Sequence, residues 1–383
     1  MYKKVLTICF CAVFIVCISL PLVFTNLKDG VVSESENRYL TSKPTLFTEE
    51  GELNKAFFGD VESWFNDNVG FRDEIVVANA QIQYNVFHQL SNNTDYLLGP
   101  KGEFNYATDD MLKDYQHFNL KEEEALKKIE NSYQFVSDWL NAQGIQFYYF
   151  QCWDKHSIYP EQFPISVNQY GDSSKTEQII SILEERTTIH VVNPKDALIA
   201  GKSQYETYSL YGDPSHWTRR GAYIGYLELM GAINAENDNK YKVLQESEYD
   251  LSLTDQGSTF FGGVHEVNML EKFELLDPKA YETNEKLTYL AEDERHRVFT
   301  NDAVDNDTRV LVLGDSYVNS YIIDDLAESF HETIIIWGDH TKYMKEIVAA
   351  YQPDIVICEN AERCDRTGPM NAAAERIQGL RDD

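Results

Sequence analysis

The chain has 383 residues, of which 43% are hydrophobic and 25% are charged, so it can bury a sizeable core. Its formal net charge is −30, and the acidic residues are spread along the chain. Such a surface repels phosphate backbones and anionic lipid headgroups. This excludes nucleic acid as a partner, and it excludes docking of the folded part on an anionic membrane surface.

The N-terminus predicts a membrane anchor at residues 1–26. Lys3 and Lys4 precede about twenty apolar residues, close to the roughly 20 residues that span a bilayer. A cleaved signal peptide is the alternative, but this run is longer than the usual apolar region and no small-x-small cleavage site follows it. The two lysines place the N-terminus inside. We therefore expect a single-pass cell-membrane protein whose C-terminal domain is extracytoplasmic.

After the anchor, residues 27–90 read as a juxtamembrane segment with an amphipathic helix near 53–66, and residues 91–383 as one domain with an irregular insertion at about 238–300. From about residue 120, apolar runs of strand length alternate with helical periodicity. Strands are predicted at 145–153, 189–194, 308–316, 331–338 and 353–360, and helices at 121–144, 173–187, 219–234, 318–330 and 340–352. This alternation is typical of βαβ units, and it predicts an α/β fold with a parallel sheet covered on both faces.

The stretch "VLVLGDSY" places Ser316 just after a predicted strand and two residues after Gly314. In open parallel sheets, ligands bind outside the carboxyl ends of the strands. A serine there is a candidate nucleophile, and its N–H at the start of the next helix can help to stabilise an oxyanion. The alternative is a strand-to-helix turn in which Asp315 or Ser316 only caps the helix.

A nucleophilic serine needs a base, and the best candidate is His216 in "YGDPSHW". Pro214 favours an extended turn at Asp213, which lies three residues before the histidine. The carboxylate can then hold one imidazole nitrogen while the other faces Ser316, and Trp217 would form an apolar wall. The alternative is a surface Asp-Pro turn with a capping serine.

A second Asp/His pair follows the predicted strand at 145–153, in "WDKH". Asp154 and His156 are predicted to contact substrate or to form structural ion pairs, and Lys155 is a plausible contact for an anion. Trp217 and Tyr317 complete the predicted substrate-binding residues.

The cysteines and histidines lack the clustered spacing that predicts a zinc site. We therefore predict no metal, and acyl transfer by a serine needs no organic cofactor. As candidate bases, His296 lies in the irregular insertion, where we expect it to be solvent-exposed, and His340 lies in a predicted helix.

Gly-Asp-Ser after a strand, together with Asp-x-x-His, resembles the SGNH/GDSL hydrolase superfamily. Here the histidine precedes the serine by about a hundred residues. That order and the anchor are similar to the AlgJ/AlgX family of polysaccharide O-acetyltransferases and to the related DHHW family, over about residues 34–363. The further matching motifs are "ENRYLTSKP", "FNDNVGFRDEI", "DKHSIYPEQFP", "HWTRRGAYIGYLELM", "VLVLGDSYVNSYIIDDLAESF" and "QPDIVICENAER".

The resemblance implies a flavodoxin-like, three-layer SGNH domain with a circularly permuted motif order. It also implies an extracytoplasmic enzyme that moves acetyl groups onto a polysaccharide, supplied by a polytopic membrane-bound O-acyltransferase and using no cofactor. Carried over, Ser316 is the nucleophile, His216 the base and Asp213 the orienting acid. The family pattern is usually Asp-x-His-Trp, so Pro214 stands at the family's acid position and Asp213 fits the wider superfamily's spacing.

Three functions therefore follow from the sequence. The first is acetyl transfer through an acyl-serine intermediate. The second is a carbohydrate acetylesterase that uses the same residues with water as acceptor. The third is a non-catalytic surface protein that keeps the fold to bind glycan or to organise a complex.

Overall fold

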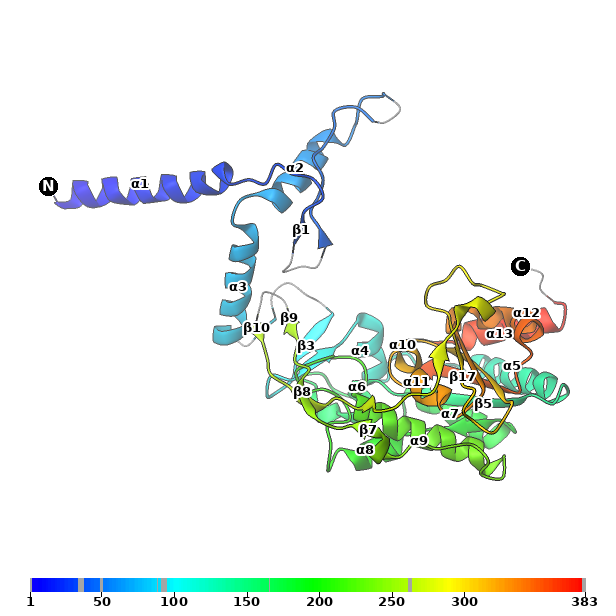
Figure 1. The fold of residues 1–383 in the computed structure, drawn as a ribbon. Coiled ribbons are helices and arrows are strands. Elements are labelled where there is room, and N and C mark those ends of the chain that lie inside the picture. Colours follow the sequence, from blue (N-terminus) through cyan, green and yellow to red (C-terminus); the bar gives the residue numbers. More distant parts are fainter. Residues whose placement is uncertain are drawn as a thin grey trace. The chain divides into compact units, whose positions relative to one another are not determined.

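The structure, a computed structural model, describes residues 2–33, 38–48, 51–87, 89–90, 95–164, 166–260 and 264–380. The chain divides into two compact units, which are described separately (Figure 1). The small unit comprises Met1–Asn93 and Thr259–Glu266, and the large unit comprises Thr94–Ser258 and Val267–Asp383.

The large unit is built on a seven-stranded sheet in the order β13-β14-β16-β15-β17-β5-β6. The five strands from β16 to β6 are parallel, whereas β14 and β13 add antiparallel pairs at one edge. The strand bounds are β13 Tyr281–Glu282, β14 Arg297–Thr300, β16 Glu332–Trp337, β15 Arg309–Gly314, β17 Ile355–Ala361, β5 Gln146–Cys152 and β6 His190–Val192. The predicted α/β class with a mostly parallel sheet is confirmed.

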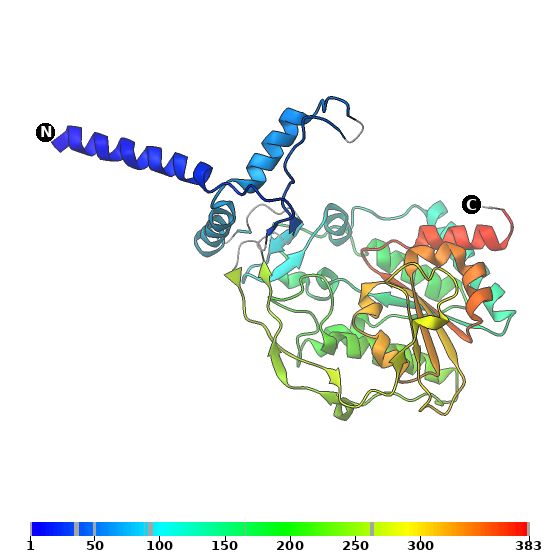
Figure 2. The same cartoon turned by 45° about the horizontal axis from the view of Figure 1, so that its top comes forward.

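Helices cover both faces of this sheet, as neighbouring residues of β5 show. Tyr149 packs against Tyr133 of α5, with ring centroids 5.6 Å apart, while Phe150 packs against Trp217, just before α9, at 6.3 Å. Successive strand residues point to opposite faces, so α5 and α9 lie on opposite sides. Figures 1 and 2 show the same arrangement, with α9 (green) and α13 (red) on either side of the strands. The long helices are α5 Glu123–Asn141, α7 Lys175–Arg186, α9 Arg219–Ala235, α12 Met344–Tyr351 and α13 Thr367–Ile377.

The predicted strands and long helices recur within a few residues, but two predicted helices are broken. The helix expected at 318–330 is divided into α10, Ser316–Asn319, and α11, Ile323–Ala327. Between them the carbonyl of Tyr321 accepts a hydrogen bond from Arg219, a tertiary contact that competes with a continuous helical ladder. The helix expected at 340–352 begins as a 3₁₀ turn, η4, Gly338–Tyr343, before α12.

The insertion at about 238–300 forms short antiparallel pairs, and its last strand, β14, joins the main sheet. Two of the pairs are β7 Tyr249–Asp250 with β12 Glu274–Leu275, and β8 Leu253–Asp255 with β11 Met269–Glu271. A further pair, β3 Tyr96–Leu98 with β4 Phe104–Tyr106, precedes α4, Asp109–Tyr115. The remaining short helices of the large unit are α6 Lys155–Ile158, η1 Pro160–Gln162, α8 Lys195–Gly201, η2 Glu246–Glu248 and η3 Asn284–Lys286.

The small unit begins with α1, Tyr2–Val23, whose residues Lys3–Val23 have a mean hydropathy of 2.7. By length and composition this helix can cross a membrane, although a signal sequence meets the same test. The other helices are α2 Phe57–Asn68 and α3 Arg72–Phe87, and the short strands pair as β1 Val32–Ser33 with β2 Arg38–Tyr39, and β9 Thr259–Phe260 with β10 Val264–His265. The helix predicted near 53–66 thus corresponds to α2.

Candidate active site

In the turn after β15, the backbone at Gly314 and Asp315 lies close to the side chain of Glu359. A Cβ at Gly314 would come 2.9 Å from Glu359 Oε2, so a larger residue would displace this carboxyl group. The next residue, Asp315, donates its N–H to the same oxygen at 2.7 Å. Its side chain accepts the N–H of Tyr317 at 3.0 Å and so caps the short helix α10. These contacts fix Ser316 at the carboxyl end of the central strand.

Ser316, His216 and Asp213 form a continuous hydrogen-bonded chain. The Oγ of Ser316 lies 2.8 Å from His216 Nε2, and His216 Nδ1 lies 2.8 Å from Asp213 Oδ2. The carboxylate is only an acceptor, so Nδ1 carries a hydrogen, and Nε2 can accept the serine proton in the neutral imidazole. This geometry is that of a nucleophile, a base and an orienting acid.

Asp213 is held as a carboxylate by several donors. Its Oδ1 accepts the backbone N–H groups of Ser215 and His216, at 2.9 and 3.1 Å, and the hydroxyl of Ser215 at 2.9 Å. Tyr321 donates its phenol hydrogen to Oδ2 at 3.1 Å. Burial by itself would raise the pKa of Asp213, but the hydrogen bonds from His216 and Ser215 outweigh it and hold this pKa well below its usual range.

Aromatic rings fix the plane of the His216 imidazole. Tyr321 stacks on it, with centroids 5.5 Å apart, and Tyr317 lies at 4.9 Å on a tilt. The His216 side chain remains 20% exposed and that of Asp213 38% exposed. The imidazole is therefore held between aromatic rings and remains partly open to solvent.

The backbone N–H of Ser316 is a donor for a developing oxyanion. It is the first residue of α10, so it has no helical acceptor, and it makes no hydrogen bond to the described part of the chain. Only this one backbone donor can be placed from the immediate turn.

The five residues predicted to bind substrate are all buried. Their exposed fractions do not exceed 2%, and Asp154 and His156 lie in ion-pairing contacts with Arg363 and Glu362, as the structural alternative predicts. These residues are Trp217, Tyr317, Asp154, Lys155 and His156. Their polar groups contact neighbouring backbone and side chains of the protein.

Asp154 and Tyr317 connect the end of β5 to the nucleophile turn. Tyr317 donates its hydroxyl to Asp154 Oδ1 at 2.8 Å, and the carbonyl of Ser215 lies 2.7 Å from the same hydroxyl. Arg363 reaches Asp154 Oδ1 at 3.1 Å and the Ser215 carbonyl at 3.3 Å. Trp217 Nε1 donates to the carbonyl of Tyr317 at 3.3 Å. The residues on both sides of His216 and Ser316 are thus tied to one buried network.

The buried side chain of Lys155 hydrogen-bonds to backbone carbonyls of the protein. Its ammonium group donates to the carbonyls of Phe104 and Ser209, at 2.6 and 2.7 Å. Burial lowers the pKa of Lys155 to about 7, although Glu103 and other carboxylates oppose this.

His156 lies beside Glu362, whose Oε1 accepts the hydroxyl of Ser157 at 2.6 Å and whose Oε2 accepts the N–H of Asp154 at 2.9 Å. Burial tends to raise the pKa of Glu362, but His156 and these donors lower it to about 2.

Comparison with known proteins identifies the family. Residues 110–335, more than half of the chain, match the family described as SGNH hydrolase-like domain, acetyltransferase AlgX. The chain belongs to this family. A search of curated proteins found no match.

Among solved structures, Bacillus cereus PatB1 is similar at 16% identity and a TM-score of 0.50, covering 72% of this chain and 98% of that chain. This likeness shows a shared fold. A DHHW family protein from Eubacterium siraeum (13% identity, TM-score 0.48, 75% of this chain and 96% of that one) also matches. So does the O-acetyltransferase domain of Pseudomonas putida AlgJ (15%, 0.44, 70% and 91%).

Two residues of this AlgX-family site were missed by sequence reasoning. Tyr321 donates to the acid, and Arg363 joins Asp154 to the loop that carries the histidine. Tyr321 is one of 24 tyrosines and lies in a stretch that reads as a plain helix, so its spacing gives no signal. Arg363 follows the last strand of the sheet, and that position is the one signal that could have suggested it.

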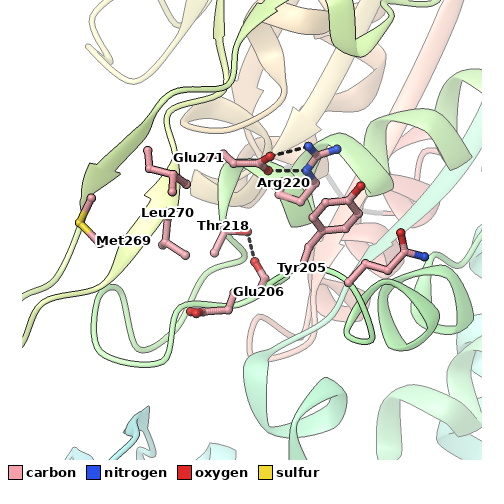
Figure 3. A pocket seen from close by; sticks show the side chains of 9 residues that line it. Tyr205, Glu206, Thr218, Arg220, Met269, Leu270 and Glu271 are labelled. Atoms are coloured by element: carbon pink, nitrogen blue, oxygen red, sulfur yellow. Dashed lines mark hydrogen bonds and ion pairs between the residues drawn. The ribbon is translucent and has the colours of Figure 1, made fainter.

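A cavity of about 330 Å³ lies in the large unit between the start of α9 and the β8–β11 pair (Figure 3). Thr218, two residues after the histidine, lines it and donates to the carbonyl of Glu206 at 2.7 Å. Arg220 forms ion pairs with Glu271 and Glu246, both at 2.6 Å. None of the three triad residues lines this cavity.

Proposed function

We propose that the protein is an extracytoplasmic O-acetyltransferase that moves acetyl groups onto a polysaccharide through an acetyl-Ser316 intermediate. The observation that carries this proposal is the 2.8 Å separation of Ser316 Oγ and His216 Nε2 within an AlgX-family domain. The non-catalytic alternative gives no reason for a serine, histidine and aspartate to be aligned in this way at the carboxyl end of a central strand.

In the first half-reaction, Ser316 Oγ attacks the carbonyl carbon of an acetyl ester while His216 Nε2 takes the hydroxyl proton. Asp213 stabilises the resulting imidazolium through the 2.8 Å contact with Nδ1. The Ser316 N–H donates to the oxyanion of the tetrahedral intermediate. When the intermediate collapses, His216 returns the proton to the departing alkoxide and acetyl-Ser316 remains.

In the second half-reaction, a sugar hydroxyl replaces the departed alcohol. His216 takes its proton as its oxygen attacks the acetyl carbon, and Ser316 leaves with that proton after collapse. The product is an O-acetylated sugar and the free enzyme. Water in place of the sugar would give hydrolysis, so the enzyme class depends on which acceptor reaches acetyl-Ser316 faster.

The length and apolar composition of helix α1 support the proposed location. We propose that α1 holds the protein in the membrane by a single pass, with Lys3 and Lys4 on the cytoplasmic side. The enzyme would then receive acetyl groups that a polytopic membrane-bound O-acyltransferase carries across the membrane. A polysaccharide outside the cell would be the acceptor.

The test uses the full-length protein in detergent with an aryl acetate as donor and an oligosaccharide as acceptor. Ser316→Ala is expected to lower turnover by at least about 10³-fold, because the nucleophile is lost. Ser320→Ala is the matched control, since this exposed serine lies on the turn after α10, and it should keep wild-type turnover. Mass spectrometry of the quenched wild-type protein should show one added acetyl group on Ser316.

Three outcomes separate the alternatives. Acetylated oligosaccharide supports transfer. Acetate release that no oligosaccharide diverts, together with acetyl-Ser316, would show an esterase instead. Equal turnover in the wild type and Ser316→Ala would rule out the mechanism altogether.

A further inference from the structure

Three side chains outside the triad converge at the edge of the main sheet. Asp293 and His296 lie just before β14, and His340 lies in η4, just after β16. Because β14 pairs antiparallel with β16, with Arg297 opposite Ile335, the start of one strand lies beside the end of the other. Residues more than forty positions apart are thereby brought together.

The ligand atoms of these residues face a common point. His296 Nε2 lies 3.5 Å and His340 Nε2 3.6 Å from Asp293 Oδ2, and all three atoms lie within 4.8 Å of one another. In a tetrahedral zinc site with bonds of about 2.0–2.2 Å, ligand atoms are separated by roughly 3.4 Å. The spacing therefore leaves room for one ion in the middle.

The hydrogen bond at the other side of His296 defines its tautomer. Nδ1 lies 2.8 Å from the carbonyl of Leu290, which can only accept, so Nδ1 carries the hydrogen. Nε2 then points its lone pair at the Asp293 carboxylate, and the side chain is fully buried. Metal-binding histidines are commonly held by a carbonyl in this way.

Each histidine has a ring nitrogen without a hydrogen-bond partner in the described part of the chain. His296 Nε2 and His340 Nδ1 are buried, with no hydrogen-bond partner among the residues that the structure describes. His296 Nε2 and Asp293 Oδ2 therefore face each other as two acceptors, and a cation between them would satisfy the buried imidazole nitrogen.

We propose that Asp293, His296 and His340 bind one Zn²⁺ ion. Two imidazoles and a carboxylate favour zinc over magnesium or calcium, which prefer oxygen ligands. Asp293 and His340 are 19% and 25% exposed, so a water molecule can complete the tetrahedron. Arg295 also binds the carboxylate, with Nη2 2.5 Å from Oδ2, and leaves that oxygen a second lone pair for the ion.

A second cluster has similar spacing between its ligand atoms, but its carboxylates have other partners in the protein. It consists of Asp114, His156 and Glu362. Lys175 Nζ lies 3.8 Å from Asp114 Oδ1 and supplies a cation there. Glu362 accepts hydrogen bonds from the hydroxyl of Ser157 and the N–H of Asp154. Groups of the protein thus already contact both carboxylates, and this cluster serves as the comparison site.

The proposed ion would fasten the end of the insertion to the turn after β16. That turn also carries Asp339, which accepts a hydrogen bond from Arg366 at 3.0 Å. Arg366 in turn pairs with Asp315, the residue before the nucleophile, at 3.1 Å. The zinc would therefore support the turn that leads to Ser316 without contacting the reacting atoms. The proposal does not depend on the proposed function.

The experiment uses full-length protein in detergent, purified with a tag that lacks histidine and stripped with a chelator. Zn²⁺ is added in competition with a chromogenic chelator, metal content is measured after gel filtration, and Co²⁺ is used as a spectroscopic probe. We expect one equivalent of zinc, a tetrahedral Co²⁺ spectrum and a higher melting temperature with Zn²⁺. His296→Gln and His340→Gln should each weaken zinc binding by at least about 100-fold.

His340→Gln is the decisive variant. The side chain of His340 is partly exposed, so replacing its imidazole leaves the buried core intact. His190→Gln, at another partly exposed histidine, and His156→Gln, in the comparison cluster, should bind zinc as the wild type does. Wild-type binding no tighter than that of His340→Gln would overturn the proposal. So would loss of zinc in His156→Gln with retention in His340→Gln, since the ion would then lie in the other cluster.

Discussion

Two short motifs of this chain each contain an aspartate, a histidine and a tryptophan, but their side chains differ in exposure. In "DPSHW", the side chains of Asp213 and His216 are 38% and 20% exposed and extend to Ser316. In "WDKH", those of Asp154 and His156 are 0% and 1% exposed and meet only protein groups. The first motif lies on a turn before a helix, and the second lies at the end of a strand whose last residues are covered on both faces.

The comparison shows that an Asp/His pair can act on a substrate only where its side chains are accessible, whatever its residue types. A carboxylate that orients a base must be fixed yet leave the base accessible, and Asp213 meets both conditions. A carboxylate such as Glu362, enclosed with His156 and bound by two donors, can only stabilise the fold. Substitutions in the two motifs should therefore separate activity from stability.

The largest expected effect is on activity, in Asp213→Asn. An amide there can donate to His216 Nδ1 and favour the wrong tautomer, so turnover of the acetyl ester should fall by about 10²–10⁴-fold. The melting temperature should fall as well, because the lowered pKa of Asp213 means that its charged form stabilises the fold at neutral pH, so turnover is measured well below both melting temperatures. Asp172→Asn, at an exposed carboxylate, is the control. A turnover within about threefold of the wild type would show that Asp213 is not the orienting acid.

The next effect is on stability, in Glu362→Gln. The pKa of Glu362 is about 2 in the folded state, below the unfolded value of about 4.3, so its charged form stabilises the fold above about pH 4.3. This stabilisation is lost as the pH falls from about 4.3 to 2. At pH 7 we expect Glu362→Gln to lower the free energy of unfolding by about 3 kcal/mol. Denaturant titrations at several pH values would measure it.

In those titrations, Glu285→Gln is the matched control because this carboxylate is exposed. If Glu362→Gln and the wild type lose stability in parallel between about pH 4.3 and 2, the charge of the Glu362 carboxylate does not stabilise the fold.

The smallest effect is the pH dependence contributed by Lys155. Its folded pKa of about 7 lies below the unfolded value of about 10.4, so between these values the unfolded state binds more protons. Stability should therefore rise with pH above about 7, by about 2 kcal/mol up to pH 9 from this residue alone. Lys155→Met should lack that rise when its unfolding curves are compared with those of the wild type. A rise of equal size in both proteins would assign it to other groups.

Much of the fold could be predicted because the signal for it is local. Strands β5, β15, β16 and β17 are apolar runs, and helices α5 and α9 have helical periodicity. The predicted bounds of these elements therefore agree with the structure within a few residues. The exceptions depended on contacts made across the chain. Arg219 takes the carbonyl of Tyr321 and breaks one predicted helix, and α13, after Cys364, had no clear signal in the sequence.

The candidate site could be predicted where motif and topology agree. A serine at the end of a strand and an Asp-x-x-His turn were enough to name the three residues that the structure brings together. The burial of Trp217, Tyr317 and the "WDKH" residues could not be predicted, since one sequence does not report burial. Likewise, His296 was expected to be solvent-exposed and is 1% exposed.

The sequence by itself therefore determined the alternation of strands and helices, the apolar N-terminal segment and the residues of the triad. These follow from local hydrophobic periodicity and from short motifs. Only the tertiary structure decided that the side chains of Trp217 and Tyr317 are buried, and that Asp293, His296 and His340 meet. Antiparallel pairing of β14 with β16 brings those last three together, and strand pairing depends on the whole sheet rather than on any short stretch of chain.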